Sequence, residues 1–494
     1  MRRTFGHVAR FFFSGLLALA IFAPATADAA KPSKSNSKVD RALQRASKTA
    51  SGPQRVIIRV KPGQRVAIAQ ALRNHGDKVY ADHSGIGAFS AEIHPEDLPI
   101  LAANAAVESI SIDGDLTALD SPKKTPPPTT TTTSTSTSTF TSVSSLVTTL
   151  GLGDFGMGAT IGVAILDSGL QNDGNFTGRI VEFHDFTGSN PAANTVPYDD
   201  YGHGSHVAGL MGSSGVLSLG KYEGVAQSLR LIVLKVLDKN GKGKTSTLIN
   251  AIEYVIANKD RLGIRVINLS LGHPIYESAA TDPLVQEVER AVRAGLIVVA
   301  AAGNIGTNPT TGLTGYAGIT SPGNAPSAIT VGASKTFNTA TRSDDRVAGY
   351  SSRGPSWYDG FAKPDVVAPG QSLISDLAAG STLALNYPSL VVTDSLHTYL
   401  KLSGTSMSTA VVSGLVALML ETNRYGAYQR ASQLYGGKYM SSGQWIPPSY
   451  PTANAVKAML QYSATRLHDD SGVEYDSLTQ GAGEVNGLGA LVLS

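Results

Sequence analysis

The stretch "LRLIVLKVLDKNGKGKTSTLINAIEYVIANKDRLGIRVINLSL", residues 229–271, decides the fold of this chain. Its two ends, 229–238 and 264–271, are almost continuous apolar runs, as strands buried on both faces require. Between them, residues 246–259 repeat apolar side chains with the period of a helix. A strand, a helix and a second strand in this order predict part of a parallel sheet covered by helices.

The turn inside this stretch, residues 239–246, has some features of a phosphate-binding loop. Gly243, Lys244 and Thr245 match the end of that motif, but Asp238 stands where its first glycine belongs. We therefore interpret residues 239–246 as a surface turn between a strand and a helix.

The same alternation continues on both sides of the quoted stretch and predicts an α/β fold with helices on both faces of a parallel sheet. The further strands are expected at 159–167, 296–304 and 327–334, and the further helices at 202–214 and 282–295. Sites in such folds form at the carboxyl ends of the strands. Asp167, Ser270 and Asn304 are the polar residues expected there.

The N-terminal third divides into shorter segments. Residues 1–29 combine arginines, a short apolar run and small residues, which is the layout of a secretory signal peptide, with an N-terminal membrane anchor as the alternative. Residues 30–54 are polar and are predicted to be flexible. Residues 55–115 alternate in the order βαββαβ, which fits a small α+β, ferredoxin-like module. Residues 116–143, rich in Pro, Thr and Ser, read as a linker to a large domain at 144–494.

Composition excludes several classes of site. The chain of 494 residues has no cysteine, so a thiol nucleophile, a disulfide framework and a thiolate metal site are ruled out. Its net charge of +2 argues against nucleic-acid binding through a basic surface. Hydrophobic residues make up 42% of the chain, enough for a sizeable core.

Two candidate residues lie near the predicted sheet. Asp167 ends an apolar strand, where a carboxylate either caps a turn or pairs with a cation or imidazole. His203 stands between Gly202 and Gly204, and we interpret these glycines as clearing space for a substrate to approach the imidazole. His206, three residues later, is expected to have a structural hydrogen-bonding role.

Two further candidates come later in the chain. Asn304 is either a turn residue or an amide donor aimed at an oxyanion. Ser406 lies among hydroxyl residues at the start of the apolar helix in 402–420, where serines commonly act as caps. The alternative is a nucleophile placed where backbone N–H groups point outward, with Gly404 permitting close backbone approach.

In chain order these four residues read Asp, His, Asn and Ser, and the chain resembles the subtilisin-like serine proteases (peptidase S8 family) over nearly all of 144–494. The motifs that carry the resemblance are "VAILDSG", "GHGSHVAG" and "SGTSMSTAVVSG", supported by "INLSLG", "VVAAAGN", "YSSRGP" and "KPDVVAPG". The βαββαβ module at 55–115 then resembles the inhibitory propeptide of that family.

The resemblance implies a role for each candidate residue. Ser406 would be the nucleophile, His203 the general base and Asp167 the residue that orients the imidazole. The Asn304 side chain and the Ser406 N–H would form the oxyanion hole. The implied substrate-binding residues are Ser270, Leu271 and Gly272 on an extended edge, and Ala301, Ala302 and Gly303 on a small apolar pocket wall that favours uncharged side chains.

The implied function is a secreted or periplasmic serine endopeptidase made as a self-processing zymogen, monomeric and without a membrane span in its mature form. Its expected partners are protein or peptide substrates and its own propeptide, and not nucleic acid. No cofactor is required for the chemistry. Structural calcium is an open possibility: Asp173, Asp199 and Asp200 are acidic candidates, but no spacing identifies a metal site.

The chain departs from the family pattern after the serine, where Ser408 replaces the usual Ala and Ala410 the usual Pro. Two other classes of function fit the sequence less well. A catalytically silent binding protein would have no reason to retain all four residues. An α/β-hydrolase esterase needs Gly-x-Ser-x-Gly, but Ser408 occupies the last glycine position. It also needs its acid and then its histidine after the serine, but Asp469 and Asp470 follow His468, the one histidine after Ser406, in the wrong order.

Overall fold

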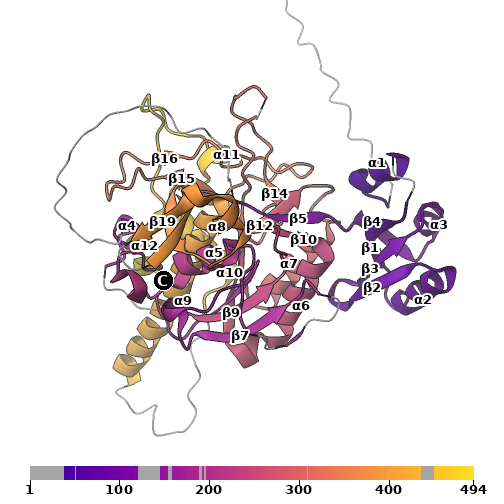
Figure 1. Ribbon diagram of the computed structural model, residues 1–494, viewed down its shortest axis with the longest axis horizontal. Coiled ribbons are helices and arrows are strands. Elements are labelled where there is room, and N and C mark those ends of the chain that lie inside the picture. Colours follow the sequence, from indigo (N-terminus) through magenta and orange to yellow (C-terminus); the bar gives the residue numbers. More distant parts are fainter. Residues whose placement is uncertain are drawn as a thin grey trace, which may run out of the picture. The chain divides into compact units, whose positions relative to one another are not determined.

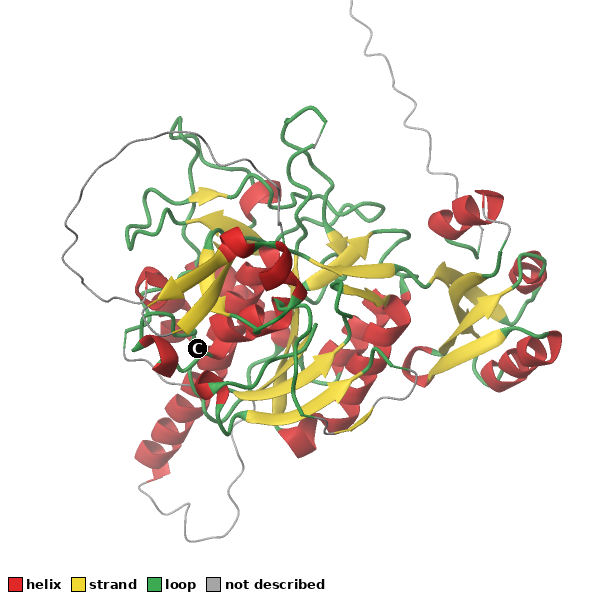
Figure 2. Ribbon diagram, viewed as in Figure 1, coloured by secondary structure: helices red, strands yellow, loops and turns green. Residues whose placement is uncertain are grey.

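The computed structural model describes residues 38–49, 52–120, 145–153, 158–188, 192–193, 196–308, 310–394, 397–435 and 450–494. The predicted signal peptide at 1–29 and residues 121–143 of the predicted linker lie outside the described residues. The elements are labelled in Figure 1 and coloured by type in Figure 2.

A nine-stranded sheet forms the centre of the large domain, in the order β16-β15-β13-β11-β6-β9-β7-β8 with β17 paired to β15. Every neighbouring pair is parallel except β15–β16 and β7–β8. This arrangement confirms the predicted parallel α/β sheet. The strands are β6 (Gly162–Asp167), β7 (Ile180–Asp185), β8 (Ala192–Ala193), β9 (Arg230–Lys235), β11 (Ile264–Leu269), β13 (Ile297–Ala301), β15 (Ile329–Lys335), β16 (Arg346–Val347) and β17 (Val366–Pro369).

Helices cover both faces of this sheet (Figure 2). Successive residues of a strand point to opposite faces, so Val163 and Ile165 of β6 enter one core while Ala164 and Leu166 enter the other. The first core is shared with α5 (His203–Gly212) and α9 (Thr405–Tyr435), and the second with α6 (Thr245–Leu262) and α7 (Pro283–Arg293). The start of α9, Thr405–Arg424, is long and apolar enough to cross a membrane, but 89% of it is buried, as in a core helix of a globular fold.

The remaining elements of the large domain are peripheral. Residues 391–394 and 397–402 form strands of a three-stranded sheet in the order β18-β20-β19. The peripheral elements of the large domain are α4 (Ser145–Thr149), β18 (Leu373–Asp376), α8 (Thr382–Asn386), β19 (Val391–Asp394), β20 (His397–Leu402), α10 (Ala453–Ser463), α11 (Ser477–Gln480) and α12 (Gly487–Leu493). Short 3₁₀ turns lie at Gly174–Phe176, Val216–Ser218 and Pro388–Leu390.

The N-terminal module, residues 38–113, is an antiparallel sheet in the order β2-β3-β1-β4 with helices on one face. This is the predicted βαββαβ module. Residues Val56, Ile58 and Val60 face the module's own core, whereas Ile57 faces the core around α6 and α7. Its elements are β1 (Gln54–Val60), α2 (Arg65–His75), β2 (Lys78–His83), a 3₁₀ turn (Ser84–Ile86), β3 (Ala88–Ile93), α3 (Asp97–Ala103) and β4 (Val107–Ile112).

The prediction of a flexible segment at 30–54 is wrong for its described second half. Residues Arg41–Thr49 form helix α1, and Leu43 is fully buried in the core of the N-terminal module. The Asp40 carboxylate accepts hydrogen bonds from the N–H groups of Leu43 and Ile112, at 2.8 and 2.5 Å. Leu43, the Asp40 carboxylate and the pairing of Val39 with Ile110 therefore order a segment whose composition is polar.

Two other boundaries differ from the prediction. Residues 116–118, expected at the start of the linker, belong to strand β5 (Asp115–Ala118). Residues 242–244, expected in a surface turn, form strand β10 (Lys242–Lys244). Both join a four-stranded sheet in the order β10-β5-β12-β14, with β12 (Leu271–Pro274) and β14 (Thr320–Ser321). Strand β10 has no strand signal of its own and is held by its backbone pairing with β5, which also pairs with β12.

Candidate active site

Asp167 and His203 meet at the carboxyl end of β6. The Asp167 Oδ1 atom lies 2.7 Å from Nδ1 of His203 and also accepts the N–H of Ser168 at 2.7 Å. Both side chains are fully buried. The interaction fixes the ring orientation and leaves Nε2 of His203 without a hydrogen-bond partner among the described residues.

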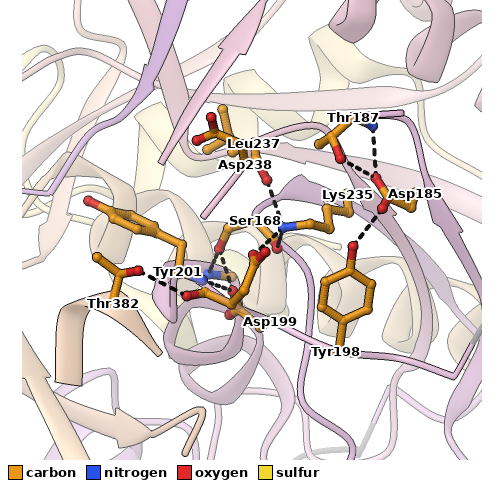
Figure 3. A network of polar contacts seen from close by, with 12 residues as sticks. Ser168, Asp185, Thr187, Tyr198, Asp199, Tyr201, Lys235, Leu237, Asp238 and Thr382 are labelled. Atoms are coloured by element: carbon orange, nitrogen blue, oxygen red, sulfur yellow. Dashed lines mark hydrogen bonds and ion pairs between the residues drawn. The ribbon is translucent and has the colours of Figure 1, made fainter. Parts of the chain in front are cut away.

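The start of α5, which carries His203, is held by Asp199 (Figure 3). Oδ1 of Asp199 accepts the N–H of Gly202 at 2.8 Å and the Ser168 hydroxyl at 2.8 Å. Oδ2 accepts both the N–H and the hydroxyl of Ser205 at 2.8 Å. The Ser168 hydroxyl in turn accepts the N–H of Gly204 at 2.9 Å. Asp199 therefore acts as a buried cap that joins the turn after β6 to the first turn of α5.

The calcium candidates from the sequence do not form one group. The oxygens of Asp199 are occupied by protein donors, and Asp200 Oδ1 lies 2.6 Å from Nζ of Lys235. The Lys235 ammonium also donates to the carbonyl oxygens of Ser168 at 2.6 Å and Leu237 at 2.8 Å (Figure 3). Lys235, which lies opposite Asp167 on the neighbouring strand, thus ties the turn after β6 to the end of β9.

The glycines beside His203 serve packing inside the protein, and the interpretation that they clear space for substrate is wrong. A Cβ on Gly204 would overlap the carbonyl oxygen of Gly169, and one on Gly202 would overlap the hydroxyl of Ser381. Gly202 also has φ of +103°, a conformation that favours glycine. Gly204 lets the turn after β6 approach the start of α5, and Gly202 does the same for the loop that carries Ser381.

His206 lies on the buried side of α5, where its Nε2 lies 3.0 Å from the carbonyl oxygen of Leu373. Burial lowers the pKa of His206 to about 3, so the ring is neutral across the physiological range. This environment agrees with a structural role.

Ser406 is buried at the start of α9 and faces Ser270 at the end of β11. The Ser406 hydroxyl donates to the Ser270 carbonyl oxygen at 2.8 Å, and the Ser270 hydroxyl donates to the Ser406 carbonyl oxygen at 3.0 Å. The hydroxyl of Ser406 thus bonds to the backbone and not to His203.

Asn304 connects the loop after β13 to the start of α9. Its Oδ1 accepts both the N–H and the hydroxyl of Thr405 at 3.0 Å, which fixes the amide. Its Nδ2 donates to the carbonyl oxygen of Leu119 at 2.6 Å. Gly404 lies beside this contact, since a Cβ there would overlap the same carbonyl oxygen. The amide N–H₂ of Asn304 therefore points at a peptide carbonyl of the N-terminal segment.

Strand β5 brings that carbonyl to the site. It pairs antiparallel with β10 on one side and β12 on the other, so that Thr117 lies opposite both Lys242 and Gly272, and Ala118 lies opposite Leu271. The N–H of Leu119 then donates to the Ser270 carbonyl oxygen at 3.3 Å, the same oxygen that receives the Ser406 hydroxyl. The N–H of Leu119 and the hydroxyl of Ser406 thus donate to the same carbonyl oxygen.

Asp120 follows Leu119 and lies next to His203. Its Oδ2 accepts the Tyr201 hydroxyl at 3.2 Å. Burial alone would lower the pKa of His203, but the negative charge and hydrogen bond of Asp167, helped by Asp120, raise it to about 9. Burial raises the pKa of Asp120, and His203 opposes that change. The segment Leu119–Asp120 thus spans the amide of Asn304 and the imidazole of His203.

The expected substrate-binding residues fall into two groups. Ser270, Leu271 and Gly272 provide the edge that pairs with β5. Ala301, Ala302 and Gly303 form a second buried segment, where Ala302 N–H donates to the Val331 carbonyl oxygen at 2.9 Å. The Gly303 N–H donates to the hydroxyl of Thr405 at 3.2 Å, which links this segment to the start of α9.

The two departures from the family pattern are also accounted for. The Ser408 hydroxyl donates to the Ala368 carbonyl oxygen of β17 at 2.9 Å, so it anchors α9 to the sheet. Ala410 is fully buried inside α9, where alanine is a favourable helix residue.

Sequence reasoning missed Leu119 and Asp120, the pairing of β10, and the roles of Asp199 and Lys235. One available signal was the alternation in "DLTALD", residues 115–120, just before the Pro- and Thr-rich segment. The buried lysine had no comparable signal, because its partners come from three separate segments.

The profile of the Subtilase family, Peptidase_S8, matches residues 158–483, which include Asp167, His203, Asn304 and Ser406. The chain belongs to the subtilase family. The serine protease AprX of Bacillus subtilis is 40% identical to this subtilase over 271 residues, covering 54% of this chain and 58% of that protein. Subtilisin E of the same species is 36% identical over 271 residues, covering 53% and 56%.

These alignments span little more than half of each relative's length. Among solved structures, fervidolysin from Fervidobacterium pennivorans, described as a keratinolytic enzyme related to subtilisin, matches with a TM-score of 0.62 at 18% identity. That match covers 89% of this subtilase and 61% of fervidolysin, and it supports a shared fold.

Proposed function

We propose that this subtilase is a secreted serine endopeptidase that is made as a zymogen and releases itself by cutting its own chain between Leu119 and Asp120. The observation that carries the proposal is the 2.6 Å hydrogen bond from Asn304 Nδ2 to the Leu119 carbonyl oxygen. A strand paired on both sides presents that carbonyl, as in recognition of a peptide by strand addition.

In the proposed reaction, Ser406 attacks the carbonyl carbon of Leu119. Its hydroxyl turns from the Ser270 carbonyl toward Nε2 of His203, which accepts the proton while Asp167 stabilises the imidazolium. The oxygen of the tetrahedral intermediate takes the negative charge, and Asn304 stabilises it together with the Ser406 N–H. His203 then protonates the amine of Asp120, and water hydrolyses the acyl-enzyme.

The same edges would take other peptides once β5 has left. A substrate would pair with Leu271 and Gly272 as β5 does, and place its own residue at the position of Leu119. Leu116 and Ala118 are buried in the core shared with α6 and α7, and Leu119 is 9% exposed. We therefore infer a preference for apolar residues before the cut bond, with the small segment Ala301–Gly303 as part of the pocket.

The proposal includes the organisation of the chain. Residues 1–29 would direct export to the medium or periplasm, and the N-terminal module with β5 would act as propeptide and intramolecular inhibitor. The peptidase domain would follow from 144 and act as a monomer on proteins and peptides. No step of this chemistry requires a metal or an organic cofactor.

The deciding experiment compares intact mass and N-terminal sequence of the purified wild-type chain with those of Ser406→Ala. We expect wild type to begin at Asp120, or downstream after further trimming, and to react with a fluorophosphonate at Ser406. Ser406→Ala should remain joined through Leu119–Asp120 and unlabelled. Ser408→Ala is the matched control, since this hydroxyl bonds to β17, and it should be processed and labelled.

A second measurement separates self-cleavage from peptidase activity. The mature enzyme should hydrolyse a peptide with the sequence of residues 116–121, "LTALDS", after the second leucine. Wild type that stays full length, unlabelled and inactive on this peptide would overturn the proposal and favour a catalytically silent binding protein.

A further inference from the structure

Two histidines and two aspartates converge on the N-terminal module, far along the chain from the proposed catalytic residues. They are His75, Asp77, His94 and Asp97, and one ligand atom from each lies within 4.8 Å of all the others. His75 ends α2, Asp77 lies in the turn that follows, His94 follows β3, and Asp97 begins α3.

The distances in this cluster are those of ligands around a small cation. Nδ1 of His94 lies 2.7 Å from Asp77 Oδ1, and Nδ1 of His75 lies 3.1 Å from Asp97 Oδ2. Nδ1 of His75 lies 3.6 Å from Asp77 Oδ2, and Nδ1 of His94 lies 3.9 Å from Asp97 Oδ2. Four ligands at 2.0–2.1 Å from a tetrahedral Zn²⁺ ion are about 3.3 Å apart, in the middle of this range.

One oxygen of each carboxylate, Oδ2, lacks the hydrogen bond that a buried oxygen normally has. The side chain of Asp77 is fully buried and that of Asp97 is 9% exposed. The Oδ2 atoms of both accept no hydrogen bond within the described residues, although both face the two imidazoles. Buried carboxylate oxygens without donors are costly, and a divalent cation between them would supply the missing partner.

The remaining contacts place these groups firmly. The N–H of His94 donates to Asp77 Oδ1 at 3.0 Å, which orients that carboxylate. The imidazoles of His75 and His94 are about half exposed, at 51% and 40%, so an ion can enter from solvent above the two buried carboxylates. A set of two nitrogens and two oxygens suits Zn²⁺ or a neighbouring transition metal, whereas calcium takes oxygen ligands alone.

We propose that His75, Asp77, His94 and Asp97 bind one divalent transition-metal ion, with Zn²⁺ as the expected occupant. The ion joins the end of α2 to the start of α3, two helices that pack on the same face of the module's sheet. It replaces the Nδ1 protons of the histidines and couples metal binding to the folding of the N-terminal module. This site does not depend on the proposed peptidase activity.

The test uses the full chain carrying Ser406→Ala, stripped of metal with a chelator and dialysed. Zn²⁺ is titrated by calorimetry, and Co²⁺ is added as a spectroscopic probe. We expect one Zn²⁺ per chain, intense visible bands typical of four-coordinate Co²⁺, and a higher melting temperature of the N-terminal module with Zn²⁺. An absence of saturable binding, or a six-coordinate Co²⁺ spectrum, would overturn the site.

Two variants and one control make the test specific. His75→Ala with His94→Ala should weaken Zn²⁺ binding on the order of 100-fold or more, because it removes two of four ligands. If the double histidine variant fails to fold, Asp97→Asn replaces it in the test. This variant keeps the size of the side chain and should weaken Zn²⁺ binding about 10-fold. His397→Ala with His468→Ala removes two histidines outside the module and should leave binding unchanged. Equal affinity in all of these chains would place the metal elsewhere and refute the proposal.

Discussion

Nδ2 of Asn304 donates a 2.6 Å hydrogen bond to the carbonyl oxygen of Leu119, across 185 residues of sequence. The donor comes from the loop after β13, and the acceptor comes from the end of the segment that follows the N-terminal module. The N–H of Leu119, in the preceding peptide group, donates to the Ser270 carbonyl oxygen, which also accepts the Ser406 hydroxyl. The chain therefore presents one of its own peptide bonds to its proposed nucleophile.

Replacing Asn304 with alanine removes the amide donor but leaves the pairing of β5 with β10 and β12. We expect Asn304→Ala to lower the rate of peptide hydrolysis by about 10²–10³, a loss known from this family, with a smaller effect on KM. The measurement is steady-state kinetics on the "LTALDS" peptide. An unchanged kcat would remove Asn304 from the oxyanion hole.

Adding a methyl group at Gly404 blocks the position of the Leu119 carbonyl. A Cβ on Gly404 would overlap that oxygen and lie 3.2 Å from Nδ2 of Asn304. We expect Gly404→Ala to slow self-cleavage on the order of 10²-fold, because the cut bond is displaced from the donor. Gly349→Ala is the matched control, since its Cβ would meet nothing closer than the Thr307 hydroxyl at 3.8 Å. Both are followed by the time course of intact mass, and equal rates would contradict the packing argument.

The pH dependence of self-cleavage should report the charge of Asp120. His203 can accept a proton only when it is neutral, and its pKa in the uncut chain is raised to about 9. Cleavage should therefore accelerate as pH rises through that region. Asp120→Asn removes a negative charge that favours the imidazolium, so the pKa of His203 falls and the midpoint moves to lower pH.

The control for this shift is Asp115→Asn on the same strand. Asp115 is 72% exposed and pairs with Lys244, away from His203. The midpoint of the pH profile of Asp115→Asn should match that of wild type. A midpoint for Asp120→Asn at or above the wild-type value would show that Asp120 does not act on His203.

Asp199 should matter for the stability of the site. Its carboxylate accepts hydrogen bonds from Ser168, Gly202 and Ser205, all of them buried. We expect Asp199→Ala to reduce the free energy of unfolding by at least about 3 kcal/mol, because several charge-assisted bonds are lost together. Asp470→Ala, which removes one exposed ion pair with Arg346, should change it by less than about 1 kcal/mol. Denaturant unfolding in a Ser406→Ala background measures both, and similar losses would refute the capping role.

Particular elements show how far sequence reasoning reached. The strands at 229–238 and 264–271 were predicted because a strand buried on both faces must be apolar throughout, and the β6 side chains do enter two cores. Helix α1 was missed because one buried leucine among polar residues gives no periodic signal. The sequence of residues 242–244 indicates a turn, because β10 is held only by its pairing with β5.

The parallel sheet, the βαββαβ module and the four candidate residues can be predicted from the sequence, because hydrophobic periodicity and local motifs are properties of residues close together in the chain. Three contacts are visible only in the folded chain: Leu119 with Asn304, Lys235 with the turn after β6, and two histidines with two aspartates on the N-terminal module. These contacts depend on backbone hydrogen bonds and on side chains brought together from distant segments. Backbone groups are the same in nearly every residue, so which strand they pair with is settled only when the whole chain has folded.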